Sequence, residues 1–319
     1  MDLYLFEVFA EEAEALRLYI GKDISYEMTS ATIQESGLAN PPARLISIRT
    51  QSIIPAAWAE KLDGILSRST GYDHLRLFRQ EMGETLPCGY LEEYATRAVA
   101  EHAVVLLLML LKKLPTQFMQ MQTFQRDGLT GAEWQGKRLL IIGVGRIGNE
   151  IAQIATQLGM EVRGVDIVRR HAHINYVNRD EGLVWADAIF CSMDLRDDNR
   201  GYFSYEVLRL AKTGAIFVNI ARGEHAPTDV LLRLLDEGHL GGVGMDVFEN
   251  EAAIARALRS GGSEHPDAVL MSRLFRNPRT ILTPHNAFNT TESVQRKAEA
   301  TAKQVVKFMQ DNCFDPQLA

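Results

Sequence analysis

Apolar residues recur along the chain with two different periods. Short runs in which nearly every residue is apolar alternate with segments whose apolar residues lie three or four positions apart. The runs predict buried strands, and the second pattern predicts helices. We expect strands at residues 3–9, 44–48, 65–66, 137–142, 161–166, 188–191, 215–219, 242–246 and 280–282. We expect helices at residues 11–20, 94–114, 149–158, 228–237 and 293–310.

This order of elements predicts an α/β protein with two domains. Strands that alternate with helices indicate βαβ units and parallel sheets. The 319 residues suggest two domains, at about 150 residues each. From residue 137 onward the alternation is continuous, which is the doubly wound pattern. The last helix could return to the first domain.

Composition narrows the class of protein. Hydrophobic residues make up 46% and charged residues 24%, as in ordinary globular chains. The net charge of -7 argues against nucleic acid as a partner, since binding domains for nucleic acid are usually basic. The three cysteines form no CxxC pair, which favours reduced thiols.

Nothing in the apolar pattern suggests a membrane protein. The strongest apolar run, residues 103–111, is far shorter than the roughly 20 residues that span a bilayer. The acidic start of the chain lacks the basic flank of a signal peptide. We therefore expect no membrane partner and a cytoplasmic protein.

A glycine-rich turn predicts a dinucleotide site. The segment Gly143-Val144-Gly145-Arg146-Ile147-Gly148 matches GxGxxG between a predicted strand and a predicted helix. Gly143 permits the tight turn, Gly145 leaves room for a pyrophosphate, and Gly148 lets helix and strand pack closely. Amides at the start of the helix, including those of Arg146 and Ile147, can hold phosphates. Asp166 ends the next strand, where an acid can bind the ribose hydroxyls.

The acid at this strand end also bears on the choice of cofactor. The carboxylate of Asp166 would repel the 2′-phosphate of NADP, so NAD is favoured. Arg169 and Arg170 follow closely, and an arginine there can accommodate that phosphate. Such a pair more commonly belongs to a solvated surface. Whether NADP is also used stays open.

Polar residues follow three later strands. Arg222 comes just after the strand at 215–219, Asp246 and Glu251 follow the next strand, and His285 follows the last. In open α/β sheets ligands bind outside the carboxyl ends of the strands. A lone residue of each type is more often structural, and the joint placement of an arginine, carboxylates and a histidine at one edge instead favours a functional cluster.

Four segments carry a resemblance to a known family. GVGRIG with Asp166, VNIARG, GMDVFENE and TPHNAF resemble the signature segments of the NAD-dependent D-isomer-specific 2-hydroxyacid dehydrogenases, and the spacing looks most like the D-lactate dehydrogenase branch. The resemblance implies a Rossmann-like NAD-binding domain at 101–291. It implies a flavodoxin-like substrate domain at 1–100 with 292–319, the active site in the cleft, and a homodimer.

The resemblance also implies roles for single residues. His285 would be the general acid/base, Glu251 would hydrogen-bond it and favour its protonated form, and Arg222 would bind the substrate carboxylate. Asp246 and Ala221 would lie near the cofactor. The substrate would contact a further set of residues: Thr70, Gly71, Tyr94 and Phe288. We expect a small 2-oxo or 2-hydroxy carboxylate as the substrate and no metal.

Two alternatives remain beside this function. An NADH-sensing, non-catalytic protein such as the related corepressors would keep much of the same site. Formate and phosphite dehydrogenases share the architecture, although formate enzymes carry Gln as the partner of the histidine, whereas this chain has Glu251.

One segment departs from the pattern of the family, and several histidines lie outside its motifs. Asp194-Leu195-Arg196 stands where the family usually has a Pro-Leu-Thr turn beside the cofactor, which leaves the shape of the turn open. We expect His102 and Glu101 to form a structural pair on the long helix. His171 and His173 have no Cys or acid at metal-ligand spacing, which favours a surface turn.

Overall fold

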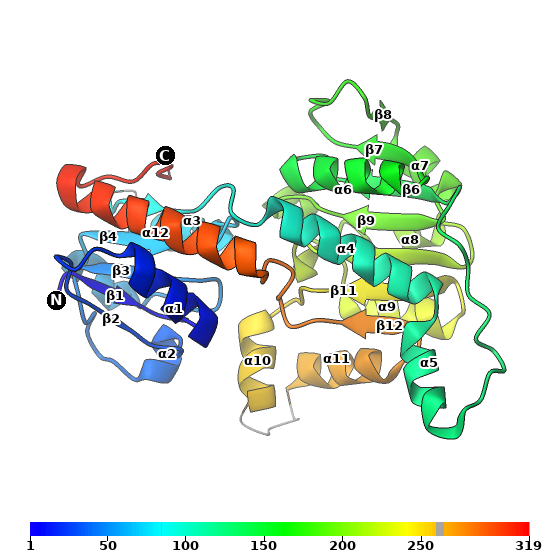
Figure 1. Ribbon diagram of the computed structural model, residues 1–319, viewed down its shortest axis with the longest axis horizontal. Helices are drawn as coiled ribbons and strands as arrows, with labels where there is room; N and C mark the ends of the chain where they lie inside the picture. The colour runs from blue at the N-terminus through cyan, green and yellow to red at the C-terminus, as the bar shows by residue number, and fades with distance from the viewer. Residues whose placement is uncertain (84, 260–264, 319) are drawn as a thin grey trace. The chain divides into compact units, whose positions relative to one another are not determined.

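The chain divides into two units in the computed structural model, which describes residues 1–83, 85–259 and 265–318 (Figure 1). Unit 1 consists of Met1–Ala95 and Asn289–Ala319, and unit 2 consists of Thr96–Phe288. The second segment of unit 1 contains the final helix, which joins the fold of the N-terminal segment. The substrate and cofactor roles expected for two such units remain predictions.

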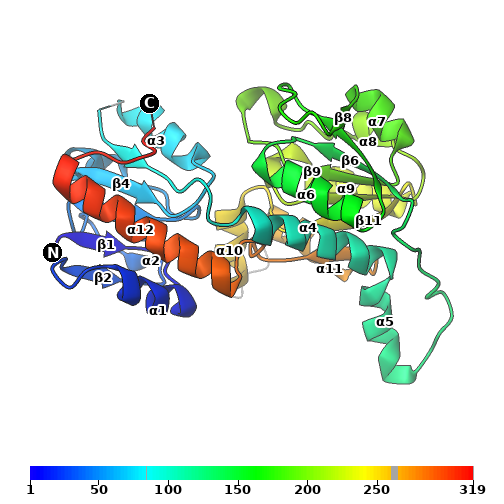
Figure 2. The same cartoon turned by 45° about the horizontal axis from the view of Figure 1, so that its top comes forward.

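Unit 1 is built on a parallel sheet. Its elements are β1 (Leu3–Leu5), α1 (Ala10–Tyr19), β2 (Tyr26–Met28), α2 (Ile33–Ser36), β3 (Leu45–Ile48), η1 (Ala56–Lys61), β4 (Gly64–Ser67), α3 (Asp73–Met82), β5 (Cys88–Gly89) and α12 (Thr291–Asp311). The strand order is β2-β1-β3-β4-β5, the order of flavodoxin-like folds. Every residue of β3 and β4 is buried, as expected for parallel strands covered on both faces. Helix α12 packs along α1 over one face (Figure 2).

Unit 2 is a doubly wound fold. Its elements are α4 (Thr96–Leu111), α5 (Leu114–Gln120), η2 (Met121–Thr123), β6 (Arg138–Ile142), α6 (Arg146–Gln157), β7 (Glu161–Val165), β8 (Asn175–Tyr176), α7 (Arg179–Trp185), β9 (Ala188–Cys191), η3 (Asp197–Asn199), α8 (Tyr205–Arg209), β10 (Ala215–Asn219), η4 (Gly223–His225), α9 (Thr228–Asp236), β11 (Leu240–Met245), α10 (Glu251–Arg259), α11 (Pro266–Arg276) and β12 (Thr280–Leu282).

The sheet of unit 2 confirms the predicted α/β class. All its paired strands are parallel, in the order β12-β11-β10-β9-β6-β7-β8. This is the Rossmann order with one further strand, β12, at the edge. Helices α4 and α6 pack together on one face, and α7 and α9 cover the other (Figure 1). The strand order reverses between β6 and β9, which is where such folds bind their ligands.

Several predicted boundaries were wrong for local backbone reasons. The helix expected at 94–114 stops at Leu111, because Lys113 has a left-handed backbone (φ 53°) and α5 starts anew at Leu114. The strand expected at 3–9 stops at Leu5, since Glu7 has a φ of 56°. The helix expected from residue 149 begins already at Arg146. The pattern did not predict β8, α10 or α11.

Candidate active site

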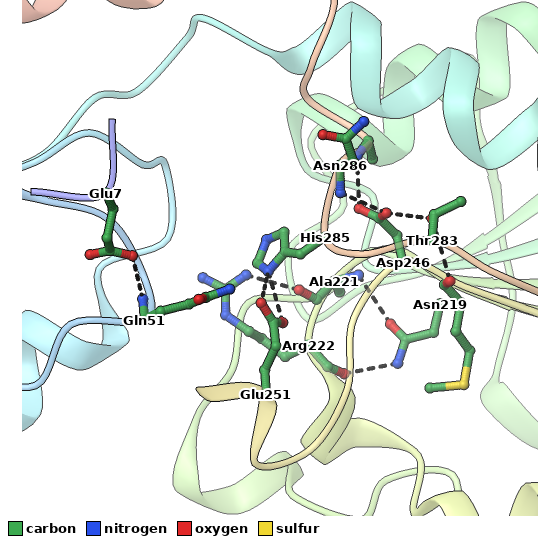
Figure 3. A network of polar contacts seen from close by, with 12 residues as sticks. Glu7, Gln51, Asn219, Ala221, Arg222, Asp246, Glu251, Thr283, His285 and Asn286 are labelled. Carbon is green, nitrogen blue, oxygen red and sulfur yellow. Dashed lines mark hydrogen bonds and ion pairs between the residues drawn. The ribbon is translucent and has the colours of Figure 1, made fainter. Parts of the chain in front are cut away.

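The polar residues predicted to act together in unit 2 lie beyond neighbouring strands. Arg222 follows β10, Asp246 follows β11, and His285 follows β12. Because β10, β11 and β12 are adjacent and parallel, their carboxyl ends meet at one edge of the sheet. Glu251 reaches the same edge from the first turn of α10 (Figure 3).

The centre of this cluster is a histidine-carboxylate pair. His285 Nδ1 lies 2.9 Å from both Oε1 and Oε2 of Glu251. Each side chain is 21% exposed, so the pair is sheltered and still reached by solvent. A carboxylate only accepts hydrogen bonds, so Nδ1 carries a proton here. Nε2 is thereby left as the nitrogen that can exchange a proton with a ligand.

Asp246 holds the loop that presents the histidine. Its buried carboxylate accepts hydrogen bonds from the backbone N–H groups of Asn286 and Ala287, both at 2.8 Å, and from the hydroxyl of Thr283 (Figure 3). These bonds fix the residues on both sides of His285, whose own backbone is left-handed (φ 51°). The structure therefore shows Asp246 fixing the loop, and its expected proximity to the cofactor stays a prediction.

The pairing expected between His102 and Glu101 was wrong. His102 Nε2 lies 3.0 Å from Thr283 Oγ1 and 3.8 Å from Asp246 Oδ1, so it belongs to the network that holds the histidine loop. Glu101 instead pairs with Arg97, which also reaches Glu150. Residues 101 and 102 are neighbours on a helix, and such neighbours do not face each other.

A second set of contacts fixes the backbone of Arg222. The side chain of Asn219, which is fully buried, accepts a hydrogen bond from Ala221 N at 3.0 Å and donates one to Arg222 O at 2.8 Å. The guanidinium donates to Ala221 O at 2.8 Å. At Gly223 an added Cβ would lie 1.9 Å from the carbonyl carbon of Phe248. Only glycine lets the loop carrying Arg222 pack this closely against the loop that leads to Glu251.

The glycine-rich turn fits the pyrophosphate of a dinucleotide. Gly143 has a φ of 92°, and a Cβ on Gly148 would lie 2.1 Å from Gly143 O. A Cβ on Gly145 would meet no atom within 4 Å, so this is the open position that a phosphate can approach. Gly145 is also the N-cap of α6, where helix amides attract anions, and the exposed Arg146 begins the helix with Ile147 after it.

Asp166 follows β7, beside the glycine-rich turn. Its Oδ2 accepts from Val144 N at 2.6 Å and its Oδ1 accepts from Val168 N at 2.9 Å. These bonds hold the carboxylate at the strand end where it suits a ribose diol. Arg169 and Arg170 are exposed, and the guanidinium of Arg169 lies 6.0 Å from the centre of the Tyr176 ring. His171 and His173 lie in the same segment, after Arg170. No group of His, Cys, Asp and Glu able to hold a metal occurs within the described residues.

The residues assigned to the substrate are divided between the units. Thr70 and Gly71 are half-buried in the turn after β4, where Ser69 Oγ donates to Gly71 O at 2.8 Å. Tyr94 is buried in unit 1, and its carbonyl accepts hydrogen bonds from Ser293 Oγ and Arg296 Nε of α12. Phe288, the last residue of unit 2, is buried as well. Their contact with a substrate stays a prediction.

Sequence reasoning missed the residues that support these side chains. Asn219, Thr283 and His225 make their decisive bonds to backbone atoms or to Asp246, and no motif spacing in one sequence exposes such contacts. The one available signal is that Asn219 ends the buried strand β10 and Thr283 directly follows β12, at the edge that carries the site. Among the described residues, no helix is long and apolar enough to span a membrane.

Comparison with known proteins places the chain in a family. Residues 104–287 match the NAD binding domain of the D-isomer specific 2-hydroxyacid dehydrogenases. Over 257 residues the chain is 29% identical to a D-lactate dehydrogenase of Curvularia clavata, covering 79% of this chain and 73% of the relative. Over 289 residues it is 28% identical to a D-specific alpha-keto acid dehydrogenase of Enterococcus faecium, covering 88% of both chains.

A solved structure extends the likeness to the whole fold. The D-lactate dehydrogenase of Aquifex aeolicus, solved with NAD and lactic acid, is 27% identical and superposes with a TM-score of 0.85 over 98% of this chain and 96% of that chain. The expectation that NAD is the cofactor is confirmed, because the matched region is the NAD-binding domain of the family. The chain belongs to the D-isomer specific 2-hydroxyacid dehydrogenases, which are NAD-dependent oxidoreductases.

Proposed function

We propose that this enzyme interconverts a small 2-oxo acid and the corresponding D-2-hydroxy acid, as in the D-lactate dehydrogenase branch. The observation that carries the proposal is the His285–Glu251 pair, which shares one sheet edge with Arg222. NADH, when bound, supplies the hydride that the carbonyl carbon receives. Its pyrophosphate would be held by the glycine-rich turn and its ribose by Asp166, with Ala221 and Asp246 toward the reacting end.

Each polar side chain then has one task. The guanidinium of Arg222 pairs with the substrate carboxylate and polarises the adjacent carbonyl. His285 donates the Nε2 proton to the carbonyl oxygen during reduction and takes it back during oxidation. Glu251 stabilises the imidazolium and fixes the ring through Nδ1. A carboxylate in this position suits proton transfer, which argues against the formate alternative.

The remaining assignments concern the substrate. Thr70 and Gly71 would offer backbone amides to its carboxylate, and Tyr94 and Phe288 would contribute aromatic surface to the pocket. Such surface accommodates side chains from lactate size upward. A homodimer and a cytoplasmic location belong to the same proposal.

The test is NADH oxidation with a panel of 2-oxo acids from glyoxylate and pyruvate to 2-oxoisocaproate and phenylpyruvate, followed by chiral analysis of the product. We expect turnover that yields the D-hydroxy acid. Measurable NADH binding without turnover on any member of the panel would overturn the proposal and favour an NADH-sensing protein.

A further inference from the structure

A buried histidine touches the backbone of the residue proposed to bind the substrate carboxylate. His225 ends η4, three residues after Arg222, and is fully buried. Its Nδ1 lies 3.2 Å from Arg222 O. The same oxygen accepts hydrogen bonds from His225 N at 3.3 Å and from Asn219 Nδ2 at 2.8 Å. The carbonyl of Arg222 is therefore held by two side chains and one backbone amide.

The neighbouring strand β9 leads into a second turn at the same edge of the sheet. Asp194 begins the Asp194-Leu195-Arg196 segment, which departs from the usual turn of the family. Asn199 closes this segment, because its Nδ2 donates to Asp194 O and its Oδ1 accepts from Arg196 N, both at 2.8 Å. These two bonds close the turn after β9.

That turn is in contact with the glycine-rich turn on its other side. Ser192 Oγ donates to Gly143 O at 2.6 Å. A Cβ on Gly143 would lie 2.6 Å from Met193 N, so the two backbones are packed as closely as glycine allows. The segment that follows β9 is therefore packed directly against the glycine-rich turn.

The protonation state of His225 follows from its surroundings. The pKa of the imidazole is lowered to about 4, mainly by burial and to a lesser extent by the guanidinium of Arg222, and the backbone opposes this change. The ring is neutral near pH 7 and carries one N–H. A carbonyl only accepts, so that N–H is on Nδ1 and points to Arg222 O. Nε2 has no hydrogen-bond partner within the described part of the chain.

We propose that His225 is a positioning residue that holds the backbone carbonyl of Arg222 and so sets the direction of the guanidinium. The inference rests on the proposed role of Arg222. A buried polar ring costs free energy that an apolar side chain of this size would not, and the hydrogen bond to Arg222 O offsets that cost. Without the ring, the peptide that carries the guanidinium loses one of its two side-chain anchors.

The test compares two variants of His225. His225→Leu keeps the bulk and removes the donor, and we expect the KM for the 2-oxo acid to rise about tenfold, the effect of losing one hydrogen bond, while the Kd for NADH is unchanged. His225→Asn restores an N–H close to the place of Nδ1, and we expect its KM to stay within about threefold of the wild-type value. An unchanged KM in His225→Leu overturns the inference.

His239 offers a matched control in the same unit. It is buried, and its Nε2 lies 3.1 Å from Leu208 O, so His239→Leu removes a similar bond away from Arg222. We expect His239→Leu to lower the Tm without changing KM. If His239→Leu and His225→Leu raise KM equally, His225 acts only through general stability and the inference fails.

The decisive experiment combines His225→Leu with Arg222→Lys. If the histidine acts through the arginine, its effect on KM disappears when Arg222 is already replaced. An undiminished effect in the double variant overturns the inference. A failure of the proposed function is recognisable separately, because Arg222→Lys alone would then leave KM unchanged.

Discussion

Each unit holds a cluster of charged side chains, and the two clusters differ in their access to water. In unit 1, Arg68 Nε and Lys297 Nζ lie 3.0 Å and 2.6 Å from Glu12 Oε1, and all three side chains are 0% exposed. In unit 2, His285 and Glu251 are each 21% exposed. The first cluster joins α1, the end of β4 and α12, whereas the second joins the loop after β12 to the first turn of α10.

This difference in exposure separates charged residues that stabilise the fold from charged residues that can take part in a reaction. A fully buried ion pair cannot meet a ligand, and its partners remain ionised only while they face one another. The other two guanidinium nitrogens of Arg68 donate hydrogen bonds to Ser47 Oγ and Phe6 O, so all three nitrogens bind groups within unit 1. The partly exposed pair instead keeps one nitrogen of His285 open. We expect substitutions in the first cluster to change stability and substitutions in the second to change turnover.

The largest effect on turnover is expected from His285→Ala. Loss of a positioned general acid lowers kcat by about 100- to 10,000-fold. The Kd for NADH should stay the same, because no contact of the glycine-rich turn is altered. Steady-state kinetics and a fluorescence titration with NADH measure the two quantities. Turnover retained in this variant would contradict the assignment of the acid.

The largest effect on stability is expected from Glu12→Gln. This change leaves the buried Arg68 without its counter-charge. It also removes the carboxylate that opposes the lowering of the Lys297 pKa by burial. We expect the free energy of unfolding to fall by about 3–5 kcal/mol in urea titrations. Asp63→Asn is the control, because its pair with Arg44 is exposed on the surface, where water screens the two charges, and we expect a much smaller loss. Equal losses in the two variants would remove the distinction between buried and exposed pairs.

A smaller effect, again on turnover, is expected from Glu251→Gln. The amide oxygen can still accept from Nδ1, but the charge that supports the imidazolium is lost. A charge-assisted hydrogen bond of about 1.5–3 kcal/mol corresponds to a fall in kcat of about 10- to 100-fold. We expect the Tm to change little. A large loss of Tm with normal kcat per folded molecule would place Glu251 among the structural charges.

The last effect concerns acid stability and extends the comparison to His225. Its folded pKa of about 4 lies below the usual value of 6.5, so the unfolded chain binds the proton first and stability falls as the pH drops from about 6.5 toward 4. Removing this histidine should lessen that loss by up to about 3 kcal/mol, since each unit of pKa difference corresponds to about 1.4 kcal/mol. Urea titrations of His225→Leu across this range measure it, and an unchanged slope would contradict a buried, neutral ring.

The protonation of Glu12 should affect stability in a lower pH range. Its ordinary pKa is 4.5; burial would raise it, but Arg68 and Lys297 together outweigh burial and lower it to about 2. The unfolded chain therefore takes up this proton first, and the associated stability is present above pH 4.5 and lost as the pH falls toward 2. Glu12→Gln should abolish the loss of stability between pH 4.5 and 2 and leave unchanged the loss between pH 6.5 and 4 that His225 causes.

Both the fold class and the four signature segments could be predicted from sequence. Strands such as β9 and β10 are short apolar runs whose burial on both faces leaves a strong pattern. Elements without that pattern were missed, among them the two-residue β8, and the helix boundary at Lys113 depends on one left-handed residue. The residue types needed for the chemistry, Arg222, Glu251 and His285, could also be named in advance.

The tertiary structure alone decided which charges are open to a ligand and which residues hold them in place. The sequence alone does not distinguish Glu12 from Glu251. The packing shows that Glu12 lies buried beside Arg68 and Lys297, whereas Glu251 faces His285. His102 has Glu101 as its neighbour in sequence but contacts Thr283, and His225 supports a backbone carbonyl. Periodicity and motifs report local conformation and residue type, whereas exposure and hydrogen-bond partners depend on segments far apart in the chain that only folding brings together.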